Sequence, residues 1–301
     1  MMVRVELLDR VVATVSPDAL EAYESAIAAH CLAVSFTLDE ARNIWVIEGY
    51  AEPGTLTGLD NSLLIAEAIT GVAAQIQRDQ VPAGGWLARS YAGFPEQQIG
   101  ARFAIRGSHI NEPPAPGRIT ITLDAGLAFG SGEHQSTRGC LLALEQRYRR
   151  RRPLRMLDLG TGSGVLAIAC AKLWHQRLLA TDIDARSVRV ARENAQRNGV
   201  GASIMAIKAD GWQSATLKRA APFDLILANI LARPLAAMAG TLAANLAPGG
   251  TAILAGLLTV QERWVLTAHR RHGLMLQSRI RSGAWSSLVL RKPDRRPVIS
   301  R

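Results

Sequence analysis

The second half of the chain alternates between two hydrophobic periods. Short apolar runs, typical of strands buried on both faces, are each followed by a segment whose apolar residues recur as they would along one side of a helix. Repeated alternation of this kind predicts a parallel sheet with helices covering both of its faces. The expected strands are 155–159, 178–182, 206–208, 223–228 and 251–257, and the expected helices are 165–174, 185–198 and 234–246.

The end of the chain departs from this alternation. Two strand-like segments, 274–281 and 285–290, are separated only by a turn around Ser282 and Gly283. That gap is too short for a crossover helix, so we expect the two strands to form an antiparallel hairpin at the edge of the sheet. A parallel sheet closed by such a hairpin is typical of Rossmann-like methyltransferases.

The beginning of the chain follows another pattern. A strand over 3–8 precedes a helix that Ser16 and Pro17 begin, because serine caps a helix and proline fits its first turn. Two strands over 32–38 and 43–50 and a helix over 59–76 come next. This order predicts a small α+β unit of the ferredoxin-like type.

We therefore expect two domains separated by a stretch whose pattern is loose and rich in proline. The expected divisions are an N-terminal α+β domain over 1–80, a linker region over 81–116, an α/β domain over 117–294 and a basic tail over 295–301.

The overall charge favours anionic surroundings. The chain holds 35 basic and 25 acidic residues, a net charge of +10, which fits either an ordinary basic protein or one that works near ribonucleoprotein. No apolar run is long enough to span a bilayer, and the three cysteines are too widely spaced for a disulfide framework or a zinc cluster. We expect a cytoplasmic protein.

A glycine-rich turn follows the first strand of the predicted sheet. Gly160, Gly162 and Gly164 are spaced as G-x-G-x-G, and a helix begins directly after them. Glycines let the backbone approach a ligand closely, at the carboxyl end of a strand where open α/β sheets bind ligands. Dinucleotide sites use G-x-G-x-x-G instead. The spacing favours S-adenosylmethionine, whose amino-acid end lies over this turn in methyltransferases.

Polar residues also end the next three strands. Asp182 follows the second strand, where a carboxylate can accept both ribose hydroxyls of the cofactor, whereas Asp184 is placed to cap the next helix. Asp210, after the third strand, either meets the adenine amino group or is an ordinary loop acid. Asn229 ends the fourth strand, where it can hydrogen-bond the cofactor or an incoming amine. The sequence after Asn229 lacks the Asn-Pro-Pro-aromatic motif of adenine and glutamine methyltransferases.

A second glycine-rich segment lies upstream of the sheet. Residues 123–138 read LDAGLAFGSGEHQSTR, a loop that can serve as a lid over a pocket. Together with Asn229-Ile230-Leu231, this segment closely resembles the ribosomal protein L11 methyltransferase family, and the similarity covers roughly residues 80–290. The chain departs from the family pattern at Ala125, where proline is usual, at Ser131 and Ser136, where threonines are usual, and at Glu133 in a variable position.

The resemblance implies a fold, a cofactor and several residue roles. We expect an α/β, Rossmann-like class I methyltransferase domain with a mostly parallel seven-stranded sheet, preceded by a domain that recognises the substrate. S-adenosyl-L-methionine is the implied cofactor. The implied cofactor-binding residues are Thr137, Gly160, Gly162, Asp182, Asp210 and Asn229, and the implied catalytic residues are Asn229 and Phe129.

Metal chemistry is not expected. Glu133 and His134 are adjacent, but no further ligand follows at helical spacing and the His-Glu-x-x-His motif is absent. Loop hydrogen bonding or a substrate contact are the roles we expect for His134. Trp174 and Trp212 are expected to pack in the core.

These features together predict an enzyme that methylates lysine side chains and the N-terminal α-amino group of ribosomal protein L11. We expect it to act as a monomer on L11, free or on the large ribosomal subunit, near ribosomal RNA and away from membranes. The alternative is the same chemistry on another protein, such as an electron-transfer flavoprotein subunit. The glycine spacing disfavours a nicotinamide-dependent dehydrogenase, and the intact loop, Asp182 and Asn229 disfavour a non-enzymatic RNA-binding factor.

Overall fold

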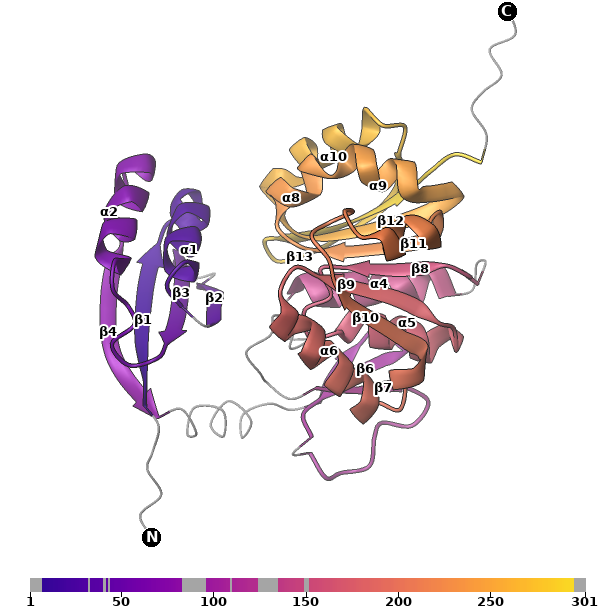
Figure 1. Cartoon of the computed structure of the whole chain (residues 1–301), viewed down its shortest axis with the longest axis horizontal. Coiled ribbons are helices and arrows are strands. Elements are labelled where there is room, and N and C mark those ends of the chain that lie inside the picture. The colour runs from indigo at the N-terminus through magenta and orange to yellow at the C-terminus, as the bar shows by residue number, and fades with distance from the viewer. Residues whose placement is uncertain are drawn as a thin grey trace, which may run out of the picture. The chain divides into compact units, whose positions relative to one another are not determined.

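The computed structural model describes residues 7–31, 33–39, 42, 44–82, 96–108, 110–123, 135–148 and 152–294. The described residues fall into two compact units, one over 7–82 and one over 96–294 (Figure 1). In this part of the chain, no helix has the length and apolar character needed to cross a membrane.

The N-terminal unit is a four-stranded sheet with two helices. The sheet is antiparallel throughout, in the order β2-β3-β1-β4. This is the ferredoxin-like arrangement that the sequence predicted. Its elements are β1 (Leu7–Val15), a 3-10 turn (Pro17–Ala19), α1 (Leu20–Ala28), β2 (Ala33–Asp39), β3 (Ile44–Ala51), α2 (Leu59–Thr70) and β4 (Gln75–Pro82).

Two boundaries in this unit differ from the prediction. The first strand continues to Val15 instead of ending at residue 8, since Val11, Ala13 and Val15 form one buried face that Val12 obscures in the sequence. Residues 3–6 of the predicted strand lie outside the described residues. The second helix ends at Thr70 rather than 76, because Gly71 adopts a left-handed conformation with φ of 68°. Strand β4, which no prediction included, then pairs with β1.

The second unit is built on a seven-stranded sheet in the order β10-β9-β8-β11-β12-β14-β13. The five strands from β10 to β12 are parallel, and β14 is antiparallel to both of its neighbours, which confirms the predicted hairpin. The strands are β8 (Met156–Leu159), β9 (Leu178–Asp182), β10 (Ile204–Lys208), β11 (Phe223–Asn229), β12 (Leu246–Leu258), β13 (Met275–Ser282) and β14 (Trp285–Arg291).

Helices cover both faces of this sheet, as Figure 1 shows. Successive residues of β11 alternate between two cores, with Leu225 and Leu227 in one and Ile226 and Ala228 in the other. The first core is closed by α4 (Gln135–Tyr148), α5 (Val165–Trp174) and α6 (Ala185–Arg197). The second is closed by α7 (Ala215–Ala220), α8 (Ala232–Ala237), α9 (Ala239–Asn245) and α10 (Glu262–Arg270).

The single helix predicted over 234–246 is wrong. The chain instead forms α8 and α9, which are separated at Met238, and β12 already begins at Leu246. The helices α7 and α10 were not predicted. Trp174 and Trp212 are buried, which confirms their expected packing role.

A small three-stranded sheet precedes α4 and completes the first core. It comprises β5 (Gln97–Ile99), β6 (Phe103–Arg106) and β7 (Ile119–Thr122), with β6 and β7 parallel. Its buried side chains join the same core as α4 and α5.

Candidate functional site

The glycine-rich turn joins β8 to α5 and is held against the neighbouring strand β9. The amides of Gly160 and Thr161 both donate to the carbonyl of Thr181, at 2.8 and 2.9 Å. Gly160 has φ of 73°, and a Cβ placed on it would lie 2.3 Å from Cγ2 of Ile230. Glycine is therefore needed here for both the backbone conformation and the close approach of the segment after β11.

The buried carboxylate of Asp158 accepts hydrogen bonds from the turn and from the helix that follows it. Oδ2 of Asp158 accepts hydrogen bonds from the hydroxyl of Thr161 at 2.6 Å and from the amide of Ala167 at 3.1 Å. Burial raises the pKa of Asp158 to about 6, and the nearby charge of Asp182 adds to this shift. Sequence reasoning counted Asp158 as the first residue of the cofactor loop but assigned its side chain no role of its own. The signal it offered was an acidic residue inside an otherwise apolar strand, which must find donors when it is buried.

The Asp182 carboxylate lies at the end of β9 and faces the turn. Its Oδ2 accepts from the amide of Gly162 at 2.9 Å, and its Oδ1 accepts from the amide of Asp184 at 3.0 Å. A carboxylate offers about four acceptor sites, so two remain for a pair of hydroxyl groups. Asp182 is half-buried and can therefore reach a ligand.

Asp184 has the different role that the sequence predicted. Its side chain accepts from the amides of Arg186 at 2.9 Å and Ser187 at 3.2 Å, and so caps the N-terminus of α6. The hydrogen bond from Arg186 is the main reason that the pKa of Asp184 is lowered.

The tip of β11 brings two distant side chains together. Nδ2 of Asn229 donates to Oγ1 of Thr137 at 3.2 Å, a contact between residues 92 positions apart. Thr137 is fully buried in α4, and Asn229 is 8% exposed. Oδ1 of Asn229 has no hydrogen-bond partner among the described residues. A buried amide oxygen of this kind remains available for a donor on a ligand.

Strand register places Asn229 beside the glycine-rich turn. Ala228 of β11 pairs with Leu159 of β8, so Asn229 and Gly160 come next on adjacent parallel strands. The carboxyl ends of β8, β9 and β11 thus meet at one edge of the sheet, where α/β folds bind ligands.

Of the two predicted site residues that remain, Asp210 is among the described residues and Phe129 is not. Asp210 is exposed and follows β10 at the same edge of the sheet, where its Oδ2 accepts from Nε2 of Gln213 at 3.5 Å. Residues 124–134, which include Phe129, Glu133 and His134, lie outside the described residues. In the described part of the chain, no group of three or more His, Cys, Asp or Glu side chains is arranged to hold a metal ion.

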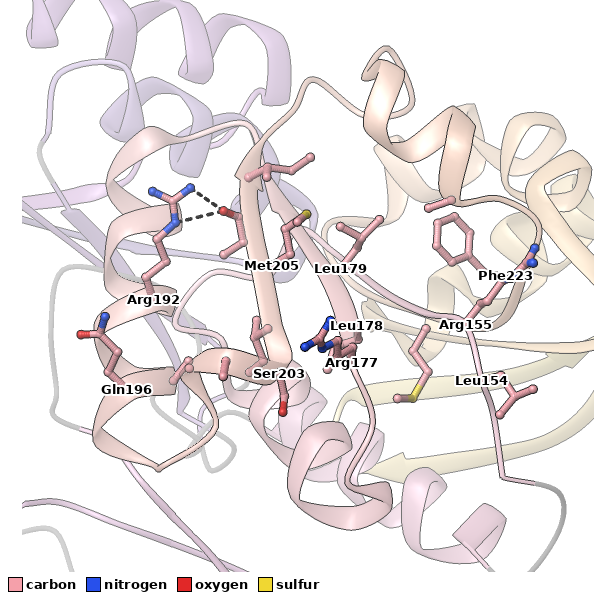
Figure 2. Close-up of a pocket in the computed structure, with 18 of the residues that line it drawn as sticks. Leu154, Arg155, Arg177, Leu178, Leu179, Arg192, Gln196, Ser203, Met205 and Phe223 are labelled. Atoms are coloured by element: carbon pink, nitrogen blue, oxygen red, sulfur yellow. Dashed lines mark hydrogen bonds between the residues drawn. The ribbon is translucent and has the colours of Figure 1, made fainter.

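A separate hollow of about 940 Å³ lies away from this edge, at the amino ends of the strands (Figure 2). Leu154 and Arg155, which precede β8, and Arg177, which precedes β9, contribute to its lining. The guanidinium of Arg192 donates to the carbonyl of Ala206, as drawn in the figure. Since the glycine-rich turn lies at the opposite ends of the strands, this hollow is distinct from the candidate site.

A sheet whose last strand is inserted antiparallel, with this glycine spacing at its first strand, defines the Rossmann-like methyltransferases of class I. The match is closer still to one family. The family model described as Ribosomal protein L11 methyltransferase (PrmA) matches residues 47–293. The chain belongs to that family, and the resemblance noted in its sequence is confirmed.

Individual relatives agree with this assignment. A ribosomal protein L11 methyltransferase of Bradyrhizobium diazoefficiens is 46% identical over 230 residues, which cover 76% of this chain and 78% of the relative. One from Rhizobium meliloti is 43% identical and covers 84% of this chain and 87% of the relative. Among solved structures, a ribosomal protein L11 methylase from Lactobacillus delbrueckii subsp. bulgaricus has a TM-score of 0.59 and 34% identity, covering 65% of this chain and 98% of that chain.

Proposed function

We propose that this protein transfers methyl groups from S-adenosyl-L-methionine to amine nitrogens of ribosomal protein L11, namely lysine side chains and the N-terminal α-amino group. The observation that carries the proposal is the buried Asn229 amide, held by Thr137 beside the glycine-rich turn in a chain of this family. The relatives are named for L11, which does not favour the alternative of an electron-transfer flavoprotein subunit.

The residues at the carboxyl edge of the sheet fit the cofactor. The turn at Gly160 and Gly162 can lie against its amino-acid end, and the free acceptor sites of Asp182 suit two ribose hydroxyls. We assign Asp210, which follows the next strand and is exposed, to the adenine amino group. When bound, S-adenosylmethionine supplies a methyl group attached to a positively charged sulfur.

Asn229 orients the acceptor in this proposal. Its Oδ1 can accept a hydrogen bond from an amine, while the bond from its Nδ2 to Thr137 fixes the plane of the amide. An amide does not take up a proton at neutral pH, so Asn229 positions the amine and does not deprotonate it. A pocket from which water is largely excluded lowers the pKa of an amine and frees its lone pair. We therefore assign catalysis to alignment and desolvation, and we keep Phe129, which lies outside the described residues, as the second proposed catalytic residue.

The division of labour between domains is part of the proposal. We assign substrate recognition to the N-terminal domain, predicted over residues 1–80, and methyl transfer to the second unit. The described part of that unit begins at residue 96, inside the predicted linker region over 81–116, and includes the predicted domain over 117–294, which a basic tail over 295–301 follows. We further propose that the enzyme is a cytoplasmic monomer that meets L11 free or on the large ribosomal subunit, and that its basic charge suits the nearby ribosomal RNA.

Tritiated S-adenosylmethionine and purified ribosomal protein L11 test the proposal directly. The purified chain should label L11, and mass spectrometry should find the methyl groups on lysine side chains and on the α-amino group. Saturable cofactor binding without label on L11, free or in hypomethylated ribosomes, would show that the substrate is another molecule. The absence of saturable binding in calorimetry would remove the cofactor assignment as well.

A further inference from the structure

Arginines from four segments line the hollow at the amino ends of the strands (Figure 2). Arg155 and Arg177 directly precede β8 and β9. Arg192 lies on α6, and Arg219 lies on α7. We call this space, of about 940 Å³, the arginine hollow. The described residues that line it include no acidic residue, so its wall gathers positive charge without a carboxylate to balance it.

Three of these guanidinium groups are not neutralised from within the described part of the chain. Arg155, Arg177 and Arg219 are exposed, and no ion pair of any of them is found among the described residues. Asp224 lies close by in β11, but its Oδ2 accepts from the backbone amides of Leu154 and Arg155, at 2.9 Å each. Like charges that share a hollow repel one another, and a bound anion removes that cost.

The fourth arginine disfavours a peptide as the ligand. Nε and Nη2 of Arg192 donate to the carbonyl of Ala206 in the edge strand β10, at 3.0 and 2.6 Å. An open sheet edge can pair with an added strand, and this guanidinium covers a carbonyl that such a strand would use. Arginine has five N–H donors, so three of them remain for an anion.

Exposed apolar side chains lie among the arginines. Leu154 is 63% exposed and Met205 is 57% exposed, and both contribute to the lining. A guanidinium binds two oxygens of a phosphate at once, and the sugars and bases of nucleic acid have apolar faces. A lining that combines arginines with exposed apolar side chains therefore suits a nucleic acid strand better than a bare inorganic anion.

The positive charge extends beyond the arginine hollow. Residues 83–301 contain 31 basic and 13 acidic residues, a net charge of +18, whereas residues 1–82 have a net charge of −8. Arg152, which ends an arginine-rich run that begins at Arg147, donates from Nη2 to the carbonyl of His175 at 3.2 Å and so lies beside the segment that leads into β9. Basic charge spread in this way favours a polymer of phosphates over a single nucleotide.

We propose that the arginine hollow binds the phosphates of an RNA strand, with Leu154 and Met205 against its sugars and bases. The hollow lies at the opposite ends of the strands from the glycine-rich turn, so RNA and S-adenosylmethionine occupy different ends of the sheet. The choice of RNA rests on the proposed function, in which the enzyme works near ribosomal RNA. RNA binding is measured without methyl transfer, so the two proposals can fail separately.

Fluorescence anisotropy of the full chain with a labelled single-stranded RNA of mixed sequence tests the proposal. Arg177→Gln/Arg219→Gln should raise the Kd for RNA about tenfold or more. The slope of log affinity against log salt should become shallower by about 1.4, because each phosphate contact to a single strand contributes about 0.7. Calorimetry should show the parental affinity for S-adenosylmethionine. Arg219→Gln alone gives a milder form of the test if the double variant folds poorly.

A matched control removes the same charge elsewhere in the unit. Arg263 and Arg270 are exposed on α10 and do not line the hollow. Arg263→Gln/Arg270→Gln should keep the Kd for RNA within about twofold of the parent, because charges distant from the strand are screened by salt. Photo-crosslinking with thiouridine-containing RNA should modify residues 154–156 or 201–207, which line the hollow.

Several outcomes would overturn the RNA site. A parental Kd and salt slope in Arg177→Gln/Arg219→Gln would remove it, and an equal loss in the control would show general charge attraction only. Competition by a free mononucleotide as strong as by the RNA strand would make the hollow a nucleotide site. Sedimentation that shows a parental dimer dissociated by the substitutions would make it a self-association surface. If the parent binds RNA at the hollow but leaves L11 unlabelled, the proposed function fails and the RNA site stands.

Discussion

Asn229 and Thr137 are 92 residues apart in the chain, yet Nδ2 of the amide lies 3.2 Å from the threonine Oγ1 in a buried setting. The contact exists because α4 packs against the strands around β11. Gly139, two residues after Thr137 in α4, allows the helix to lie close to the sheet. A Cβ placed on Gly139 would lie 2.2 Å from Oγ of Ser287 in β14. The acceptor end of the candidate site is thus built by tertiary packing.

Replacing Thr137 by valine removes the hydroxyl and keeps the shape. We expect Thr137→Val to leave Nδ2 of Asn229 buried and unpaired, at a stability cost on the order of 1–3 kcal/mol. A tilted amide should also lower kcat/KM for methylation of L11 by about tenfold or more. Thr137→Ser, which keeps the hydroxyl, should retain most of the activity. Equal activity in the valine and serine variants would show that the hydrogen bond does not position Asn229.

The pH dependence of stability should report on Asp158. Burial raises the pKa of this carboxyl to about 6, so the folded chain binds its proton more tightly than the unfolded chain does. The carboxyl therefore costs stability as the pH rises from its ordinary pKa of 3.8 through about 6. Asp158→Asn removes this cost and keeps an oxygen acceptor. The melting temperature of the variant relative to the parent should increase across that pH window, and a constant offset would contradict the assignment.

Gly160 and Gly199 have nearly the same backbone conformation. Alanine variants of the two therefore distinguish the cost of backbone strain from the cost of a steric collision. Gly160 has φ of 73° and would collide with Ile230, whereas Gly199 has φ of 72° and no atom within 4 Å of an added Cβ. Gly199→Ala should cost about 1–2 kcal/mol, from the left-handed conformation alone. Gly160→Ala should cost more and should also abolish cofactor binding in calorimetry. Similar melting temperatures for the two variants would show that the turn can move away from Ile230.

Neighbouring aspartates should have separable effects. Asp182→Ala removes the carboxylate that we assign to the ribose, and we expect cofactor affinity to fall by on the order of 1.5–3 kcal/mol. Asp184→Ala removes the cap of α6 and should cost about 1 kcal/mol of stability with little change in affinity. Calorimetry with S-adenosylmethionine and thermal unfolding measure the two effects. An Asp182→Ala variant with parental affinity would remove this residue from the cofactor site.

The order of elements in the second unit was predictable because each β-α step is local. Apolar runs and helical spacing lie within the segments themselves, and the glycine turn, Asp182 and Asp184 each follow a strand directly. The prediction of a single helix over 234–246 was wrong, because the residues of α8 and α9 are similar in composition. The apolar stretch through Met238 supports one long helix as well as two short ones, and only packing on β12 decides between them.

The sequence by itself determined the βαβ cofactor turn, the strand-end carboxylates and the family, since these depend on residues close together in the chain. The tertiary structure alone decided which distant residues meet. It pairs Asn229 with Thr137 and buries Asp158, which raises the pKa of that carboxyl. It also leaves Ile65 and Ile69 of α2 exposed. The physical reason is that burial and contact depend on the order of strands in the sheet and on which helix packs against each face.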